Sequence, residues 1–272
     1  MKFSNFLIAA VSASFLVACG GGGGDSPAGS GTPTGGSTAP TATATPGQAQ
    51  GFYAGNFVFS GTPRQFQLAI LENDEYWALY GLANAGGGLT VFGFIQGQGT
   101  TTNGTFTSSN LRDFGVTPAA AGSLSATYQT GISVSGTVTA NGTPASFAAN
   151  TSASDIATYN TPANLADITG SWVGTALDGV TTFNLSIGAT GAISGSSAAG
   201  CTVSGTMASR ASGKNVFDVH LTTAASAACG TAAGQSGNGI GASSLLSNGK
   251  RQLLIALVSA DRSTGTVLFS TR

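Results

Sequence analysis

Short segments with alternating apolar and polar residues recur from residue 51 onward, and they constrain the fold more than any other feature. In the run 65–70, apolar side chains alternate with polar or small ones, which is typical of a half-buried strand. Turn pairs such as Asn103–Gly104 and Asn141–Gly142 separate these segments, and both residue types accept the positive φ angles of tight hairpins. Helical periodicity is confined to one expected turn at 161–165. The pattern predicts an all-β protein.

The expected strands fall into two groups of about eight. They are 52–59, 66–70, 76–80, 89–95, 123–129, 132–139, 144–148, 170–176, 181–187, 192–196, 201–209, 215–222, 240–246, 252–259 and 264–270. Residues 51–55 (GFYAG) and 170–174 (GSWVG) share the pattern Gly-x-aromatic-x-Gly, and each begins one group, which suggests duplication. Eight antiparallel strands can close into a barrel and so remove exposed sheet edges.

These observations predict two small antiparallel β-barrels of about eight strands each, in tandem. The first domain is expected at 51–149 and the second at 167–272, with the polar segment 150–166 as the linker. The run 253–258 lacks clean alternation, so we expect it to be buried on both sides, where the barrels meet. A single domain of two packed sheets is the alternative.

The N-terminal segment 1–18 has the organisation of a secretory signal: a basic start, a short apolar run and small residues before a cleavage site. Its last residues and the next, Leu16-Val17-Ala18-Cys19, resemble the lipobox cut by lipoprotein signal peptidase. That resemblance implies that Cys19 becomes the N-terminus and carries acyl chains that hold the protein to a membrane. The residue after Cys19 is Gly20, whereas an Asp at this position would suggest retention in the inner membrane. Similarity to lipoprotein sorting in enterobacteria therefore implies that the protein is delivered to the outer membrane.

In the expected tether 19–50, the residues after Cys19 are Gly, Pro, Ser, Thr, Ala and Gln, with Asp25 as the one charged residue. Because these side chains offer almost nothing to bury, the segment cannot offset the entropy cost of becoming ordered. A Gly-rich coil of this length has an end-to-end distance of roughly 30 Å. We therefore expect a disordered tether between the membrane and the barrels.

The lipobox, the polyglycine run at 20–24 and the expected small barrels together resemble the surface lipoproteins of Gram-negative bacteria. The group of transferrin-binding protein B and factor H-binding protein is the best-known example. The resemblance implies a two-barrel fold that binds a protein partner through loops and barrel faces, and it extends to no ligand-specific motif. The Gly-x-Trp sequence at 170–172 is also similar to that of lipocalins, which implies the alternative of a periplasmic carrier for a small apolar ligand.

The charge composition argues against nucleic acid as a partner. Charged residues are 7% of the chain, the formal net charge is −1, and Lys and Arg are scattered apart from Lys250–Arg251. Binding to nucleic acid needs a basic patch that neutralises phosphates. Low charge with 42 Gly residues is typical of an exported β-protein with many turns.

The sequence offers few groups for catalysis or metal binding. His220 is the single histidine, so a His-rich zinc site is excluded, and the Gly-x-Ser-x-Gly motif of hydrolases is absent. Asp218 and His220 share one face of an expected strand, as a solvent-facing pair or, much less favoured, as a general base. The acidic run 72–75 is read as a soluble hairpin turn in preference to a Ca²⁺ site. We expect no enzyme activity, cofactor or metal.

Cys201 and Cys229 remain after Cys19 is assigned to lipid, and an exported protein favours their pairing in a disulfide. The aromatic residues Tyr76 and Tyr80 lie on the opposite face of their strand from Trp77, so one face must point outward or toward the other barrel. Exposed aromatics often mark interaction sites. The residues considered for binding on this ground are Tyr53, Tyr76, Trp77, Tyr80 and Trp172.

Three functions remain in order of preference. The first is a non-catalytic binding or structural lipoprotein that presents two β-domains from the envelope to an unknown protein or envelope ligand. The second is the lipocalin-like carrier, which requires an internal cavity. The third is a hydrolase that uses Asp218 and His220.

Overall fold

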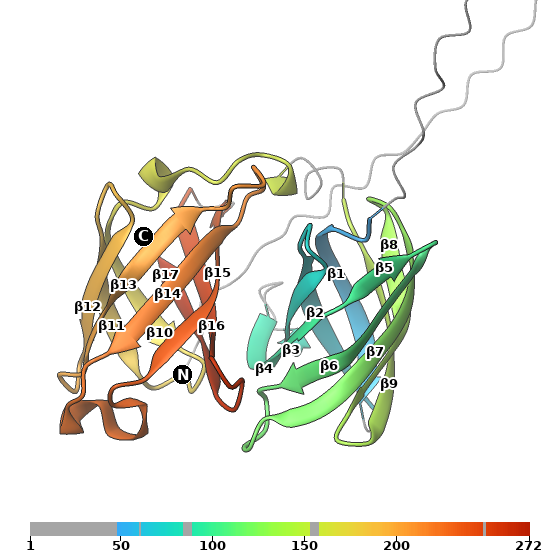
Figure 1. Ribbon diagram of the computed structural model, residues 1–272, viewed down its shortest axis with the longest axis horizontal. Helices are drawn as coiled ribbons and strands as arrows, with labels where there is room; N and C mark the ends of the chain where they lie inside the picture. Colours follow the sequence, from blue (N-terminus) through green and yellow to red (C-terminus); the bar gives the residue numbers. More distant parts are fainter. Residues whose placement is uncertain (1–47, 60, 84–88, 153–157, 247–248) are drawn as a thin grey trace, which may run out of the picture.

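The computed structural model describes residues 48–59, 61–83, 89–152, 158–246 and 249–272, and it confirms the all-β prediction. Two eight-stranded antiparallel barrels lie side by side (Figure 1). The signal segment, Cys19 and most of the expected tether lie outside the described residues. None of the helical segments in the described part of the chain has the length and hydrophobicity that a membrane crossing requires.

The first barrel is built from neighbouring hairpins. Its strands are β1 (Gly51–Phe59), β2 (Thr62–Ile70), β3 (Glu75–Ala83), β4 (Leu89–Gln98), β5 (Thr100–Thr102), β6 (Thr105–Asp113), β7 (Ala120–Gln129), β8 (Ser133–Ala140) and β9 (Thr143–Asn150). Pairing of β1 with β9 and of β4 with β6 closes a ring of eight, and the short β5 pairs with β6 at one end. Asn141 and Gly142 have φ angles of 48° and 74°, as the hairpin between β8 and β9 requires.

Strand β6 lies where the sequence predicted no strand. Its buried apolar residues are Phe106 and Leu111, whose odd separation breaks the two-residue alternation. The pairing with β7 shifts register between Ser108 and Leu111, so one extra residue on β6 restores the inward phase. Because of this bulge, a search for strictly alternating apolar residues does not identify β6 as a strand.

The second barrel is a closed ring in simple sequence order. Its strands are β10 (Gly170–Ala176), β11 (Thr182–Ile187), β12 (Ala192–Ser197), β13 (Thr202–Ser209), β14 (Phe217–Thr223), β15 (Ser236–Leu245), β16 (Arg251–Ser259) and β17 (Gly265–Thr271). A 3₁₀ turn at Leu165–Asp167, capped by Asn164, replaces the helical turn expected at 161–165. A second 3₁₀ segment, Ala227–Ala232, was not predicted.

The two barrels share an apolar contact that we call the seam. It consists of buried side chains from both barrels: Leu71, Trp77, Leu79, Phe94, Phe114, Tyr159, Val216, Ile240, Ala256, Val258 and Val267. On β16, Leu253, Ile255 and Leu257 fill the second barrel while Ala256 and Val258 enter the seam. The prediction that 253–258 is buried on both sides, where the barrels meet, is confirmed.

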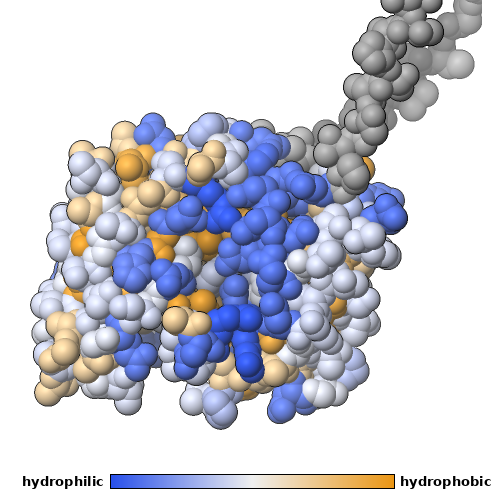
Figure 2. Space-filling view, viewed as in Figure 1, coloured by the Kyte–Doolittle hydropathy of each residue, from blue (hydrophilic) through white to orange (hydrophobic). Residues whose placement is uncertain are grey.

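Polar contacts complete the junction between the barrels. Arg210 of the second barrel lies 2.6 Å from a Glu72 carboxylate oxygen of the first. Arg262, in the turn between β16 and β17, donates to the backbone oxygens of Gln96 and Asn110 at 2.8 and 2.7 Å. On the face in Figure 2, hydrophilic residues gather along the middle of the molecule, where the barrels meet.

A candidate ligand cavity in the first barrel

The hairpins β1–β2, β3–β4, β6–β7 and β8–β9 all turn at the same end of the first barrel, which we call the mouth. A cavity of about 290 Å³ lies inside the barrel at this end. Phe59, Phe92 and Val116 line it and are 43%, 44% and 50% exposed, so the cavity is open to solvent there. Val58 and Leu82 add two more exposed apolar side chains near the mouth.

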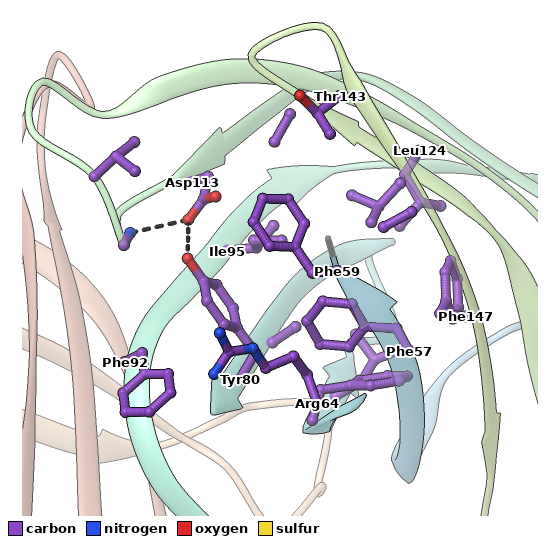
Figure 3. A pocket seen from close by; sticks show the side chains of 18 of the residues that line it. Phe57, Phe59, Arg64, Tyr80, Phe92, Ile95, Asp113, Leu124, Thr143 and Phe147 are labelled. Carbon is purple, nitrogen blue, oxygen red and sulfur yellow. Dashed lines mark hydrogen bonds between the residues drawn. The ribbon is translucent and has the colours of Figure 1, made fainter. Parts of the chain in front are cut away.

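Alternation along the strands supplies the apolar wall. On β1, Phe57 and Phe59 face inward and alternate with Asn56 and Val58, which face outward. On β3, Ala78 and Tyr80 line the cavity, while Trp77 and Leu79 point to the seam. The remaining strands add Phe66, Leu68, Ile95, Leu124, Val138, Ala140, Ala145 and Phe147 (Figure 3).

The floor of the cavity is a packed aromatic layer. Tyr76 is 1% exposed, meets the Phe106 ring edge-on at a centroid distance of 5.6 Å, and donates to the Ser108 hydroxyl at 3.0 Å. Burial raises the pKa of Tyr76 to about 12, although the Ser108 hydrogen bond acts against that change. Gly97 pairs with Tyr76 across the strands, and a Cβ there would lie 2.3 Å from the Tyr76 hydroxyl oxygen. The barrel is therefore closed below the cavity.

Besides Thr143, three polar side chains lie on the wall near the mouth: Arg64, Tyr80 and Asp113. The Tyr80 hydroxyl donates to Asp113 Oδ1 at 2.6 Å, and the Gly115 amide donates to the same oxygen at 2.9 Å (Figure 3). Burial, the hydrogen bond to Asp113 and the charge of Asp113 all raise the pKa of Tyr80, while Arg64 lowers it. Tyr80 therefore stays protonated and donates to the carboxylate.

Arg64 is the third of these groups. Its guanidinium carbon lies 5.0 Å from the centre of the Phe92 ring. In Figure 3 Arg64 lies on the same side of the pocket as Tyr80 and Phe92, and its charge acts on the Tyr80 hydroxyl. A cation on the face of an aromatic ring gains about 0.5–1 kcal/mol when partly exposed.

The interior of the second barrel differs from that of the first. It is packed with large buried side chains, including Trp172, Met207, Phe217, Leu253 and Ile255. A polar cavity lies near Phe217, Leu245 and Arg251, with Thr, Asn and Ser side chains in its lining. Between the two described barrels, the contrast is an apolar open interior in the first and a filled interior in the second.

The aromatic residues considered for binding are mostly buried. Tyr53, Tyr76, Trp77 and Trp172 are 1–5% exposed, and Tyr80 is half-buried in the cavity wall. Tyr76 and Tyr80 face the barrel interior and Trp77 faces the seam, where its ring stacks on Phe94 at 6.1 Å. Of the two alternatives for the outer face of this strand, contact with the other barrel is the one found, and these residues form no exposed patch.

Tyr53 and Trp172 have equivalent positions in the two barrels. Each lies in the Gly-x-aromatic-x-Gly motif on the first strand, and each donates to the backbone oxygen four residues earlier. These bonds run from Tyr53 to Ala49 at 2.9 Å and from Trp172 to Ile168 at 2.6 Å. Both motifs position a buried aromatic at the start of a barrel.

The predicted disulfide is confirmed. Cys201 precedes β13 and Cys229 lies in the 3₁₀ segment after β14, with their Cα atoms 4.6 Å apart. Cys19, the predicted lipidation site, lies outside the described residues.

The Asp218 and His220 pair is not assembled as a general base. Both side chains are exposed on β14, but Asp218 lies 2.6 Å from Arg210. His220 contacts Asn238 through Nδ1 at 2.9 Å and Thr222 through Nε2 at 3.4 Å. The hydrolase mechanism based on this pair is therefore not supported by the geometry.

The acidic run 72–75 forms the turn between β2 and β3, as predicted. Glu72 binds Arg210, Asp74 accepts from the amide and hydroxyl of Thr101, and Glu75 accepts from Trp77 Nε1. Within the described residues, no group of three or more acidic, His or Cys side chains could hold a metal ion.

Sequence reasoning did not single out Arg64, Asp113, Phe57, Phe59 or Phe92. The signal for Arg64 was present, because 64, 66, 68 and 70 share the inward phase of one strand. Asp113 had no such signal, since the bulge in β6 changes the phase before it.

Comparison with known proteins assigns no family. No family model matches the chain, and no curated protein sequence matches it. One similar solved structure is a variant of the vaccine antigen transferrin-binding protein B from Haemophilus parasuis Hp5. It is 9% identical, with 84% of this chain and 76% of that chain covered and a TM-score of 0.28.

Two further structures are similar at the same level. Isotype 1 transferrin-binding protein B from serogroup B Neisseria meningitidis is 10% identical, with 83% of this chain and 68% of that chain covered and a TM-score of 0.25. A protein of unknown function from the DUF3598 family of Nostoc punctiforme is 12% identical, with 82% and 95% covered and a TM-score of 0.25. Likenesses this weak carry no argument about function, so the geometry of the cavity has to carry it.

Proposed function

We propose that this protein is a lipid-anchored, non-catalytic binding protein of the bacterial outer membrane whose first barrel holds a small apolar ligand. The observation that carries the proposal is the open, aromatic-lined cavity of about 290 Å³ in the first barrel. Ligand sites are concave, mostly apolar and furnished with a few polar groups, and eight-stranded barrels are wide enough for one small ligand. The second barrel supplies the contrast: large apolar side chains pack its interior, and the cavity of about 290 Å³ near Phe217 and Arg251 is lined mainly by polar residues.

Among the functions considered from the sequence, the cavity favours the carrier. Docking of a protein through exposed aromatics loses support, because four of the five aromatic residues considered for it are buried. Catalysis loses support because Asp218 is paired with Arg210, and His220 contacts Asn238 and Thr222. Arg64, Tyr80 and Asp113 are suited to orient a ligand at the mouth.

A cavity-filling substitution tests the proposal. Ala145 on β9 lines the cavity, and Ala145→Leu would place a larger side chain in the space that the ligand occupies. We expect decan-1-ol to bind the wild-type protein in calorimetric titration. Ala145→Leu should weaken this binding by about tenfold or more, since about two methylene groups of the ligand lose their burial at ~0.8 kcal/mol each.

The matched control is Ala148→Leu, the same substitution at an exposed position of the same strand. It should leave decan-1-ol binding unchanged. Equal losses in both variants, or no binding to the wild-type protein, would contradict a ligand site in the first barrel.

The membrane anchor is tested separately. Metabolic labelling with a radioactive fatty acid should label the wild-type protein and leave Cys19→Ala unlabelled. Absence of label on the wild-type protein would overturn the lipid anchor without affecting the cavity.

The side of the membrane is decided by protease treatment of intact and lysed cells. Digestion of the barrels on intact cells would indicate a surface ligand source, and digestion after lysis alone would indicate a periplasmic carrier. The Cys201–Cys229 disulfide is compatible with either oxidising compartment.

A further inference from the structure

The cavity wall contains a cation, Arg64, whose guanidinium forms no hydrogen bond with another residue in the part of the chain that the structure describes. Strand alternation places Arg64 on the inward face of β2, in phase with Phe66 and Leu68. Its guanidinium rests on Phe92, and among the described residues no carboxylate forms an ion pair with it. A guanidinium has five N–H donors, and stacking on a ring leaves its edges free to donate.

The neighbouring acid, Asp113, is engaged through one of its two carboxylate oxygens. Asp113 Oδ1 accepts hydrogen bonds from the Tyr80 hydroxyl and the Gly115 amide. Among the described residues, none accepts a hydrogen bond from the donors of Arg64, so a ligand at the mouth can supply the acceptor. A planar carboxylate fits this requirement best, because its two oxygens match the fork of a guanidinium.

The size and polarity of the cavity limit the rest of the ligand. The cavity of about 290 Å³ is at the small end of ligand sites, and its wall is largely apolar. A single alkyl chain of about ten carbons suits a space of this size and polarity. The wall around Phe57, Phe66 and Phe147 offers such a chain apolar contacts.

We propose that the ligand is a single-chain amphiphile with a carboxylate head, whose chain occupies the cavity and whose head pairs with Arg64 at the mouth. This inference rests on the proposed function and names the ligand class of the same site. Specificity then comes from Arg64 and affinity from the aromatic wall, since burial of apolar area supplies most of the binding energy.

Titration calorimetry with decanoate and decan-1-ol tests the inference. Wild-type protein should bind decanoate about tenfold or more tightly than it binds decan-1-ol, as a charge-assisted hydrogen bond predicts. Arg64→Gln should lower decanoate affinity to about that of decan-1-ol, and its circular dichroism spectrum should match that of the wild-type protein, which shows that the variant is folded. Arg64→Lys should keep part of the preference, since it retains the charge and loses the fork.

Arg112→Gln is the matched control, because Arg112 lies on β6 of the same barrel and does not line the cavity. The variant removes one arginine charge, as Arg64→Gln does, and leaves the cavity wall unchanged. It should leave the decanoate preference intact. Equal binding of both ligands to the wild-type protein, or tighter binding of decylamine than of decanoate, would overturn the carboxylate assignment. Failure of all three ligands to bind would instead overturn the proposed function.

Discussion

Arg210 of the second barrel pairs with two carboxylates that differ in exposure, Glu72 of the first barrel and Asp218 of its own barrel. The Glu72 side chain is 24% exposed and that of Asp218 is 58% exposed, and both lie 2.6 Å from the guanidinium. Glu72→Gln should lower the free energy of unfolding by about 2 kcal/mol, because it removes a partly buried charge-assisted hydrogen bond. Asp218→Asn should cost less than about 1 kcal/mol, as exposed pairs do. Urea denaturation measures both, and equal losses would contradict this ranking.

Glu72 also gives the molecule a pH dependence with a defined sign. Burial raises the pKa of Glu72, but hydrogen bonds and the charge of Arg210 outweigh it, so the pKa in the folded protein is below its ordinary value. The resulting stability is present above the ordinary Glu pKa and is lost as the pH falls through the lowered value. The stability difference between wild type and Glu72→Gln should therefore shrink from about pH 7 to about pH 3. A difference that grows on acidification would contradict it.

At the residue scale, the sequence predicts which side chains of a strand share a face, because that follows from the alternation alone. The faces of 76–80 were separated correctly, but alternation does not say which face is inside, so the fates of Trp77 and of Tyr76 and Tyr80 stayed open. The packing partner decides this, because Trp77 meets Phe94 and the second barrel.

At the scale of elements, the disulfide links the start of β13 to the 3₁₀ segment at Ala227–Ala232 across 28 residues. Closing a loop of this size should stabilise the fold by about 3–4 kcal/mol in the chain-entropy model. The double variant Cys201→Ala/Cys229→Ala should lose this amount in thermal or chemical unfolding. A reductant should destabilise wild type and leave the double variant unchanged; equal responses would contradict a stabilising disulfide.

Most strands could be read from the sequence, and the failures have physical causes. The weakly predicted strand 240–246 proved to be the longer β15, whose first residues are polar or Gly and so carry no apolar signal. Strand β6 was missed because a bulge interrupts its phase, although the tight turn at Asn103–Gly104 was found. Residue types such as Asn and Gly therefore predict the positions of turns better than apolar alternation predicts strands that contain a bulge.

At the scale of the molecule, the seam should make the two barrels unfold together. Its apolar cluster draws on both barrels, and Arg210 and Arg262 add polar contacts across it. We expect one calorimetric transition for the wild-type protein. Ala256→Asp, which places a carboxylate in the seam, should lower stability by about 3 kcal/mol and separate the transitions.

Val173→Asp is the control for this prediction, since Val173 is 62% exposed on the second barrel. It should keep a single transition. Two transitions in the wild-type protein would show that the seam does not couple the barrels. The sequence-based division into domains at 51–149 and 167–272 stays a prediction that these measurements bear on.

The central claim is that the first barrel, and not the second, holds a small apolar ligand. The most direct measurement is the anomalous diffraction of bromine in crystals soaked with 10-bromodecan-1-ol, a neutral probe that does not depend on Arg64. We predict one bromine peak inside the first barrel, among the side chains that line its cavity. A bromine peak inside the second barrel, or an empty first barrel in crystals that bind the probe elsewhere, would contradict the account.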